Sequence, residues 1–256
     1  MSAYSETRAV MSVSGPDARD FLQNLVTNDV NGVDTGLVYA ALLTPQGKFM
    51  ADFFLEARGE TILVDIAASR ADAVFKRLMM YKLRSPVVLV KTDLRVSRGL
   101  GDTPEGALAD PRHGELGWRK IDEAATEDDT DWTALHVRLG IPQTDIELSD
   151  DTYILEYGFE RLHGVDFRKG CYVGQEIVAR MKHKTQLRKG LARVRIKGGA
   201  EPGESITAGG KPAGVLHSRA GDEGLAYLRF DRATGPLAAG EATITFIGPA
   251  IEPFDA

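Results

Sequence analysis

The amino-acid sequence predicts an α+β protein in which a mixed N-terminal region precedes an all-β C-terminal region. Short strand-like runs and helical patterns intermix before residue 140, with no internal repeat, which is typical of an antiparallel α+β arrangement. From Leu191 onward, short apolar runs are separated by glycine turns, which favours a small antiparallel barrel or sandwich. We therefore expect a domain boundary near residues 186–190.

The first helix is expected over residues 18–26, after a short strand at residues 10–14. Ser14 or Gly15 is placed to cap this helix, and Pro16 suits an early helical position. The apolar residues of the segment recur at helical spacing, which predicts that one face is buried: Phe21, Leu22, Leu25 and Val26.

Two strands, residues 37–43 and 49–55, flank the turn sequence Thr44-Pro45-Gln46-Gly47 and predict a hairpin. A helix over residues 69–81, with Ser69 as its cap, follows a strand at residues 61–66. The other elements expected before the all-β region are strands at 87–90 and 94–96, a short strand within 116–119, and helices at 133–139 and 175–181. The C-terminal strands are expected at 191–196, 213–218, 224–228 and 242–246.

Composition limits the class of protein. The 256 residues are 43% hydrophobic and 27% charged, as in ordinary globular proteins. No apolar run is long enough for a membrane helix, so no membrane association is expected. The chain has one cysteine, Cys171, which cannot form an internal disulfide, and we predict a cytoplasmic location. One cysteine and five scattered histidines cannot build a four-ligand metal site, so no metal-ligating residues are predicted.

The charge is distributed unevenly. Residues 161–198 contain eleven Lys or Arg residues against Asp166 and Glu176, whereas the whole chain has a net charge of −6. A basic segment on an acidic protein suits one localised anionic ligand better than the coating of nucleic acid. An ordinary solvated surface explains the same charges equally well.

The segment from Arg168 to Glu176 reads Arg-Lys-Gly-Cys-Tyr-Val-Gly-Gln-Glu and concentrates several reactive residue types. Cations precede Cys171, and cations favour the thiolate, which is the reactive form of cysteine. Gly170 and Gly174 on either side allow a tight turn or a close approach to a ligand, although an ordinary loop is nearly as plausible. These residues predict a functional loop that leads into a helix, with Cys171 as a cluster contact, a redox-sensitive thiol or a nucleophile.

The stretch Lys169-Gly170-Cys171-Tyr172-Val173-Gly174-Gln175-Glu176 resembles the signature K-G-C-[YF]-x-G-Q-E of the YgfZ family of folate-dependent iron–sulfur cluster assembly proteins. That family is related to the glycine cleavage T-protein, an aminomethyltransferase. Further segments also match and span most of the chain: Phe21-Leu22-Gln23, Asn28-Asp29, Gly47 to Asp52, Tyr81 to Arg84, Asp110-Pro111-Arg112 and Arg138 to Pro142. The chain departs from the family at His183-Lys184-Thr185, where His-Arg-Gly is usual, and at Gly158, where asparagine is expected.

The resemblance implies a T-protein-like ring of small domains and tetrahydrofolate as the cofactor. Residues 1–186 would form a discontinuous folate-binding region, with 1–45 and 134–186 in one subdomain and 46–133 in another. Residues 187–256 would form the barrel. The resemblance also implies iron–sulfur client or carrier proteins as partners, no stable nucleic acid binding and a monomeric state.

Two carboxylates are the strongest candidates outside the motif. Asp52 lies among phenylalanines, where a carboxyl group can act as an acid or a base, unless strand alternation simply turns it to water. Glu156 is placed to accept the paired N–H groups of a pterin, although a surface glutamate is equally compatible with the sequence. The predicted catalytic residues are Cys171 and Asp52. The predicted folate-binding residues are Asp52, Glu156, Lys169, Gly170, Tyr172, Gly174, Gln175, Glu176 and Arg180.

Three functions are compatible with these features. The first is a tetrahydrofolate-binding factor that assists the assembly or maintenance of iron–sulfur clusters. The second is an aminomethyltransferase of the glycine cleavage type, with Asp52 in the reaction. The third is an RNA-binding or tRNA-modification-associated module that uses the basic segment, although few aromatic residues accompany those cations.

Overall fold

The protein is described here by a computed structural model of residues 7–126, 128–183 and 187–251. The chain forms two compact units. The N-terminal unit comprises Ser5–Thr130 and Leu162–Ile177, and the barrel unit contains Asp131–Arg161 and Val178–Ala256. The sequence-based subdomains divide the chain at residues 45 and 46, inside a hairpin whose two strands pair in one sheet. Contacts therefore group the chain in a different way.

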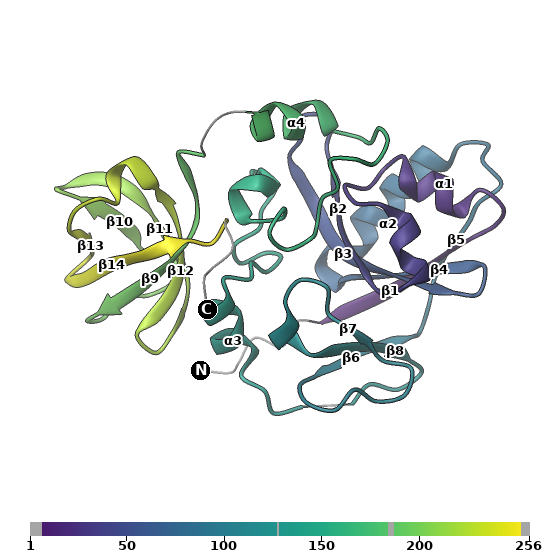
Figure 1. The fold of residues 1–256 in the computed structure, drawn as a ribbon, viewed down its shortest axis with the longest axis horizontal. Helices are drawn as coiled ribbons and strands as arrows, with labels where there is room; N and C mark the ends of the chain where they lie inside the picture. Colours follow the sequence, from purple (N-terminus) through teal and green to yellow (C-terminus); the bar gives the residue numbers. More distant parts are fainter. Residues whose placement is uncertain (1–6, 127, 184–186, 252–256) are drawn as a thin grey trace. The chain divides into compact units, whose positions relative to one another are not determined.

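The N-terminal unit is built on a five-stranded antiparallel sheet in the order β2-β3-β4-β1-β5. These strands are β1 (Arg8–Ser14), β2 (Val38–Leu43), β3 (Phe49–Arg58), β4 (Thr61–Ala67) and β5 (Val88–Lys91). Helices α1 (Ala18–Gln23) and α2 (Ala68–Lys82) contribute Phe21, Val74 and Leu78 to the apolar core on one face (Figure 1). The predicted hairpin at the turn 44–47 is confirmed, with Ala41 opposite Asp52.

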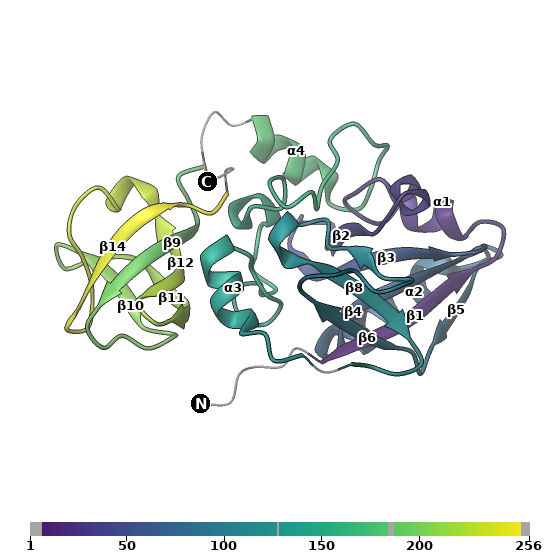
Figure 2. The ribbon, with the colours of Figure 1, turned by 60° about the horizontal axis from the view of Figure 1, so that its bottom comes forward.

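A second sheet covers part of the other face of this sheet. It has the order β6-β8-β7, with β6 (Arg95–Gly99), β7 (Leu108–Ala109) and β8 (Trp118–Asp122) (Figure 2). Val10 and Leu63 of the large sheet pack against Ile121 of β8. Two short 3-10 helices, η1 (Val30–Asp34) and η2 (Gly114–Leu116), complete the secondary structure of this unit before α4. Because both faces of β3 are covered, seven of its ten residues are buried.

The barrel unit contains a closed six-stranded barrel in the order β10-β11-β12-β9-β14-β13, which confirms the predicted α+β fold with a C-terminal barrel. Its strands are β9 (Lys189–Lys197), β10 (Ser205–Ala208), β11 (Lys211–Ala220), β12 (Glu223–Arg229), β13 (Leu237–Ala239) and β14 (Ala242–Pro249). The remaining helical elements of the chain are α3 (Trp132–Leu139), η3 (Ile154–Tyr157), α4 (Gln175–His183) and η4 (Phe230–Arg232). The chain passes from the N-terminal unit to the barrel unit within α4, after Ile177.

Two predicted helix caps are wrong, although the first helix does begin at Ala18 as predicted. The α1 cap position is Asp17, not Ser14 or Gly15, and α2 begins one residue before Ser69, so Ser69 lies in its first turn. Helix α1 also ends at Gln23 instead of Val26. Val26 instead bridges Leu42 of β2, and the Thr27 amide donates to the Ala41 carbonyl. The apolar pattern therefore continues past the end of α1, because Val26 packs and pairs with β2 instead of continuing the helix. Across the described ranges, no helix is both long and apolar enough to span a bilayer.

Candidate functional site

The loop that carries Cys171 is held by buried residues on both sides of it. Lys169 is buried, and its ammonium donates hydrogen bonds to the carbonyls of Gln23 at 2.6 Å and Val26 at 2.5 Å. Tyr172 is also buried, and its ring lies 5.1 Å from the Lys169 Nζ. Gly170 and Cys171 between them are exposed. The fold therefore presents the thiol on a loop anchored immediately before and after it.

Gly174 is required by a close contact within the N-terminal unit. Its φ is +84°, and a Cβ on it would lie 2.6 Å from the Thr44 carbonyl oxygen. On the other side of this contact, Gly47 has a φ of +72°, and a Cβ there would lie 2.7 Å from the Ile177 side chain. The motif loop thus packs on the turn of the hairpin that carries Asp52. Gly170 has neither requirement, because its Cβ would meet nothing within 4 Å.

Of the other motif residues, Gln175 stabilises the loop, whereas Glu176 and Arg180 are exposed. The side-chain Oε1 of Gln175 accepts a hydrogen bond from the Tyr172 amide at 3.3 Å, and this stabilises the turn into α4. Glu176 is exposed on the N-terminal unit, and Arg180 is exposed on the part of α4 in the barrel unit. Burial lowers the pKa of Lys169 to about 8. The contacts of Lys169 are those of a residue that caps the end of α1, so a structural role accounts for its burial.

Asp52 is buried, which excludes the interpretation that strand alternation turns it to water. Its Oδ2 accepts a hydrogen bond from the Tyr39 hydroxyl at 2.8 Å. Tyr39 lies on the neighbouring strand β2, and its ring centroid is 5.2 Å from that of Phe54. Burial and then the neighbouring Asp52 raise the pKa of Tyr39 well above its usual value. Tyr39 therefore acts as the hydrogen-bond donor in this pair.

A set of buried ion pairs near Tyr39 was not predicted from the sequence. Arg112 donates from Nε and Nη2 to the two oxygens of Asp110, at 3.0 and 2.7 Å. Arg119 of β8 donates from Nε and Nη2 to a single oxygen of Asp65 of β4, Oδ2, at 3.1 and 2.6 Å. Although burial opposes it, Arg112 and Arg119 hold the pKa of Asp110 below its usual value. The available signal was the sequence Asp110-Pro111-Arg112, which places a carboxylate two residues before a guanidinium.

Glu156 belongs to the barrel unit, where η3 carries it next to β9 and β12. It is buried, and its Oε2 accepts a hydrogen bond from the Tyr227 hydroxyl at 2.6 Å. The Lys189 Nζ lies 3.7 Å from Oε1. Tyr157 stacks on Tyr227 with ring centroids 5.4 Å apart and an interplanar angle of 10°. The sequence did not indicate Tyr227 or Lys189 as neighbours, because both come from the barrel strands.

Gly158, the departure from the family pattern, is required by its surroundings in the barrel unit. Its φ is +77°, and a Cβ there would lie 2.5 Å from the Ala250 carbonyl oxygen. An asparagine tolerates this backbone region, but its Cβ would clash with that carbonyl. Lys184 and Thr185, the other departure, lie outside the described residues.

The cations of residues 161–198 are less available to a ligand than their number implies. Arg161 donates to the carbonyls of Leu139, Gly140 and Ala250, and burial lowers its pKa to about 10. Lys182 forms an ion pair with Glu160, and Arg193 lies 3.3 Å from Glu223. Lys169 and Lys189, described above, likewise make contacts within their own units. The predicted anion-binding segment therefore does not act as one set of free charges.

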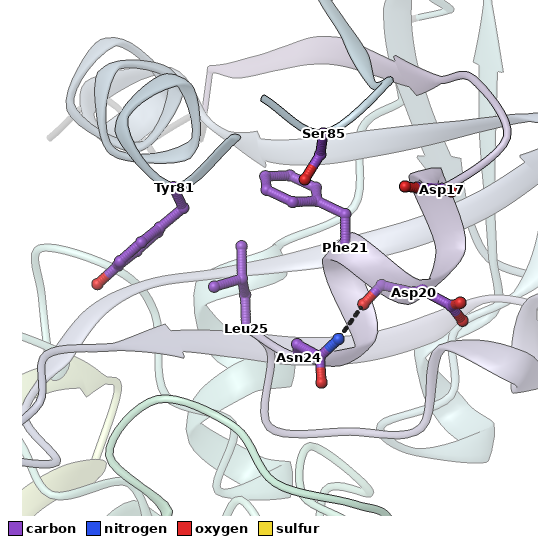
Figure 3. Close-up of a pocket in the computed structure, with 7 residues that line it drawn as sticks. All are labelled: Asp17, Asp20, Phe21, Asn24, Leu25, Tyr81 and Ser85. Carbon is purple, nitrogen blue, oxygen red and sulfur yellow. Dashed lines mark hydrogen bonds between the residues drawn. The ribbon is translucent and has the colours of Figure 1, made fainter. Parts of the chain in front are cut away.

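A pocket of about 390 Å³ lies between α1 and the end of α2 in the N-terminal unit. Figure 3 shows Phe21 and Leu25 directed toward the segment with Tyr81 and Ser85, while the Asn24 side chain bonds the Asp20 carbonyl. Its lining residues are Asp17, Asp20, Phe21, Asn24, Leu25, Tyr81 and Ser85. None of the predicted site residues is among them.

Comparison with known proteins relates most of the chain to one group. Residues 188–254 match the family described as the CAF17 C-terminal beta-barrel domain. The mouse protein "Iron-sulfur cluster assembly factor IBA57, mitochondrial" is 31% identical over 282 residues, covering 90% of this chain and 78% of the mouse protein. The human protein of the same name is 30% identical over 276 residues, with 90% and 78% covered.

A solved structure supports the fold. The aminomethyltransferase T of the glycine cleavage system from Bartonella henselae superposes with a TM-score of 0.74 and covers 96% of this chain and 85% of its own. At 12% identity, this similarity shows a shared fold and nothing about shared chemistry.

The predicted cytoplasmic location is wrong as stated. The mouse and human relatives are mitochondrial proteins. A lone cysteine shows only that the chain has no internal disulfide, and this does not distinguish the cytosol from another reducing compartment.

Proposed function

Because the chain belongs to the IBA57 family of iron–sulfur cluster assembly factors, we propose that it assists the assembly of iron–sulfur clusters in client enzymes. The resemblance to the YgfZ family led to the same class of function, although these relatives carry the IBA57 name. The partners in this proposal are the client enzymes or the proteins that carry clusters to them. The cluster itself is cargo and passes through the protein's site.

Cys171 is the proposed contact for that cargo. The observation that carries this proposal is the exposed thiol on a loop anchored by Lys169 and Tyr172. Thiolate is the ligand that iron–sulfur clusters prefer, and a fixed loop lowers the entropy lost when a partner docks. A single thiol leaves the other ligands of the cluster to be supplied by the partner. This suits transient contact with a cluster better than permanent storage.

Tetrahydrofolate is the proposed cofactor, and the chemistry of Glu156 fits it. One oxygen of Glu156 accepts from Tyr227, and the other lies 3.7 Å from Lys189. A carboxylate has about four acceptor positions, so these contacts leave capacity for the paired N–H groups of a pterin. Asp52, with its partner Tyr39, is also a proposed tetrahydrofolate-binding residue. Tetrahydrofolate, when bound, supplies a carrier for one-carbon groups.

The cysteine is tested by complementation. In a strain that lacks the protein and has low activity of iron–sulfur enzymes, the wild-type chain should restore activity and Cys171→Ser should not. Because Cys171 is exposed, the serine variant should fold and accumulate normally, which immunoblotting would show. Full restoration by the serine variant would remove the thiol from the proposal.

The cofactor is tested by calorimetric titration with tetrahydrofolate. The wild type should bind, and Glu156→Gln should weaken binding because an amide presents only one acceptor oxygen. An exposed glutamate of the barrel, Glu241, provides a matched Glu→Gln control. Equal affinity of the two variants would exclude Glu156 as a pterin contact. Aminomethyl transfer stays the alternative, and turnover of an aminomethylated carrier protein by the wild type would favour it.

A further inference from the structure

We propose that Arg112, held in place by Asp110, is a positioning residue that sets the geometry of the Tyr39–Asp52 pair. This inference rests on the proposed role of Asp52 in tetrahydrofolate binding. It concerns side chains of the N-terminal unit that stand outside the sequence motif and outside the predicted site. Their contacts link β1, β4 and β8 to the hairpin of β2 and β3.

The buried charges form a continuous series of contacts. Arg8 lies 2.5 Å from Asp65, and Asp65 lies 2.6 Å from Arg119. Arg119 Nη1 is 3.7 Å from Asp110, whose carboxylate holds Arg112 at 2.7 Å. All five side chains have less than a tenth of their area exposed. The series reaches Arg112, next to Tyr39.

Arg112 controls the position of the Tyr39 ring. Its guanidinium carbon lies 5.4 Å from the centroid of Tyr39 and 4.8 Å from that of Phe54. Asp110 fixes the guanidinium plane by two side-chain hydrogen bonds and also accepts from the Arg112 amide at 3.0 Å. The Tyr39 ring therefore lies against Phe54 and a cation of fixed orientation, and its hydroxyl donates to Asp52.

Stability alone is a weak reason for so many buried charges. Removing an ion pair from water costs free energy that its attraction often fails to recover, and apolar replacements of similar volume are frequently as stable. Fixed geometry is the clearer gain, because forked Arg–carboxylate contacts hold both partners in one orientation. The Arg119–Asp65 contact joins the two sheets of the unit. The Arg112–Asp110 contact holds the guanidinium against the Tyr39 ring, so its geometry bears on the orientation of that ring.

The test is a double-mutant cycle on tetrahydrofolate affinity, measured by calorimetry with the full chain. The single variants are Asp52→Asn, Arg112→Lys and Tyr39→Phe, and the last two are also combined with Asp52→Asn. Lysine keeps the charge of Arg112 but cannot make the forked contact. Phenylalanine keeps the Tyr39 ring and removes only its donor. Leu78→Ala, in the core on the opposite face of the sheet, controls for loss of stability.

We expect each single variant to weaken binding about tenfold, within the range of coupled neighbours. In the Asp52→Asn background, Arg112→Lys and Tyr39→Phe should have almost no further effect, because they act through Asp52. Leu78→Ala should bind like the wild type at a temperature where it is folded.

Three results would overturn the inference. The first is wild-type affinity in Arg112→Lys and Tyr39→Phe while Asp52→Asn binds weakly. The second is full additivity in the double variants, and the third is equal weakening by Leu78→Ala. By contrast, a wild type that binds no tetrahydrofolate, or an Asp52→Asn variant that binds normally, would refute the proposed cofactor site itself. If Arg112→Lys fails to fold, Asp110→Asn, which removes the carboxylate that holds the guanidinium, takes its place in the same cycle with the same expected results.

Discussion

The hydroxyl of Ser218 donates a hydrogen bond to Glu147 Oε1 at 2.5 Å, and this links β11 to the segment that follows α3. The other oxygen of Glu147 accepts from the Gln143 amide at 3.0 Å. Glu147 is almost completely buried, and burial raises its pKa to about 7. Both residues belong to the barrel unit, so this contact links the barrel to the segment Asp131–Arg161 of the same unit.

Because the pKa of Glu147 is raised, the stability of the protein should fall as the pH rises from 4.5 to about 7. The folded pKa is about 7 and the usual value is 4.5, so the folded state holds the proton more tightly. Its stabilising contribution is full below pH 4.5 and is lost as the pH rises to about 7, which corresponds to about 3 kcal/mol.

Glu147→Gln isolates this effect, because an amide can accept from Gln143 and donate to Ser218 without titrating. The free energy of unfolding of the variant relative to the wild type should increase between pH 5 and pH 8. His217 next to Ser218 is half-buried, and burial lowers its pKa, but it is present in both proteins and its effect cancels. A difference that is constant with pH would contradict the prediction. Urea unfolding at four pH values provides the measurement.

Lys169→Met should destabilise the N-terminal unit by roughly 2 kcal/mol. Methionine keeps most of the apolar stem, but the carbonyls of Gln23 and Val26 lose their charged donor. Lys182→Met is the control, because Lys182 is exposed and its pair with Glu160 lies at the surface. Urea unfolding should separate the two variants, and equal midpoints would show that the Lys169 contacts contribute nothing.

Gly174→Ala and Gly170→Ala should differ sharply in stability although only four residues separate them. Alanine at 174 would need a left-handed backbone and would place its Cβ 2.6 Å from the Thr44 oxygen. We expect this substitution to lower the free energy of unfolding by roughly 2 kcal/mol or more. Alanine at 170 meets open space and should change stability by about 0.5 kcal/mol or less. Thermal unfolding of both variants checks this, and a comparable loss at Gly170 would contradict the geometry of the loop.

Cys171 should react with iodoacetamide in the folded protein at a rate close to that in urea. The thiol is exposed, and it is the one cysteine of the sequence, so mass spectrometry should show a single adduct. The adduct should leave the unfolding midpoint unchanged because the side chain packs against no core. A rate at least tenfold slower in the folded state, roughly, would show that the loop protects the thiol.

Local sequence patterns correctly predicted the elements whose residues themselves favour a helix or a strand. Helix α3 is an example: its apolar repeat and Gly140 predicted residues 133–139, and Gly140 does end the helix with a φ of 66°. Four barrel strands were also predicted from their apolar runs. The short strands β10 and β13 were missed because a run of three or four residues has almost no periodicity. They become strands by pairing with each other and closing the barrel.

The candidate site depended more on tertiary structure. Lys169 appeared to be a ligand-binding cation, but its contacts lie with carbonyls more than 140 residues earlier in the chain. Asp52 was placed on the correct strand, yet its burial depends on a second sheet that covers β3. Tyr227 and Lys189 meet Glu156 only because η3 packs beside β9 and β12.

The sequence by itself determined the fold class, the barrel, the hairpin of Asp52 and the loop of Cys171, because strand alternation, helical spacing and turn residues act over a few neighbouring positions. Only the tertiary structure decided which polar groups are buried together. Arg119 and Asp65 are 54 residues apart, and neither has a local feature that marks the other as its partner. They pair because two sheets pack face to face, and a charge buried between sheets requires an opposite charge beside it.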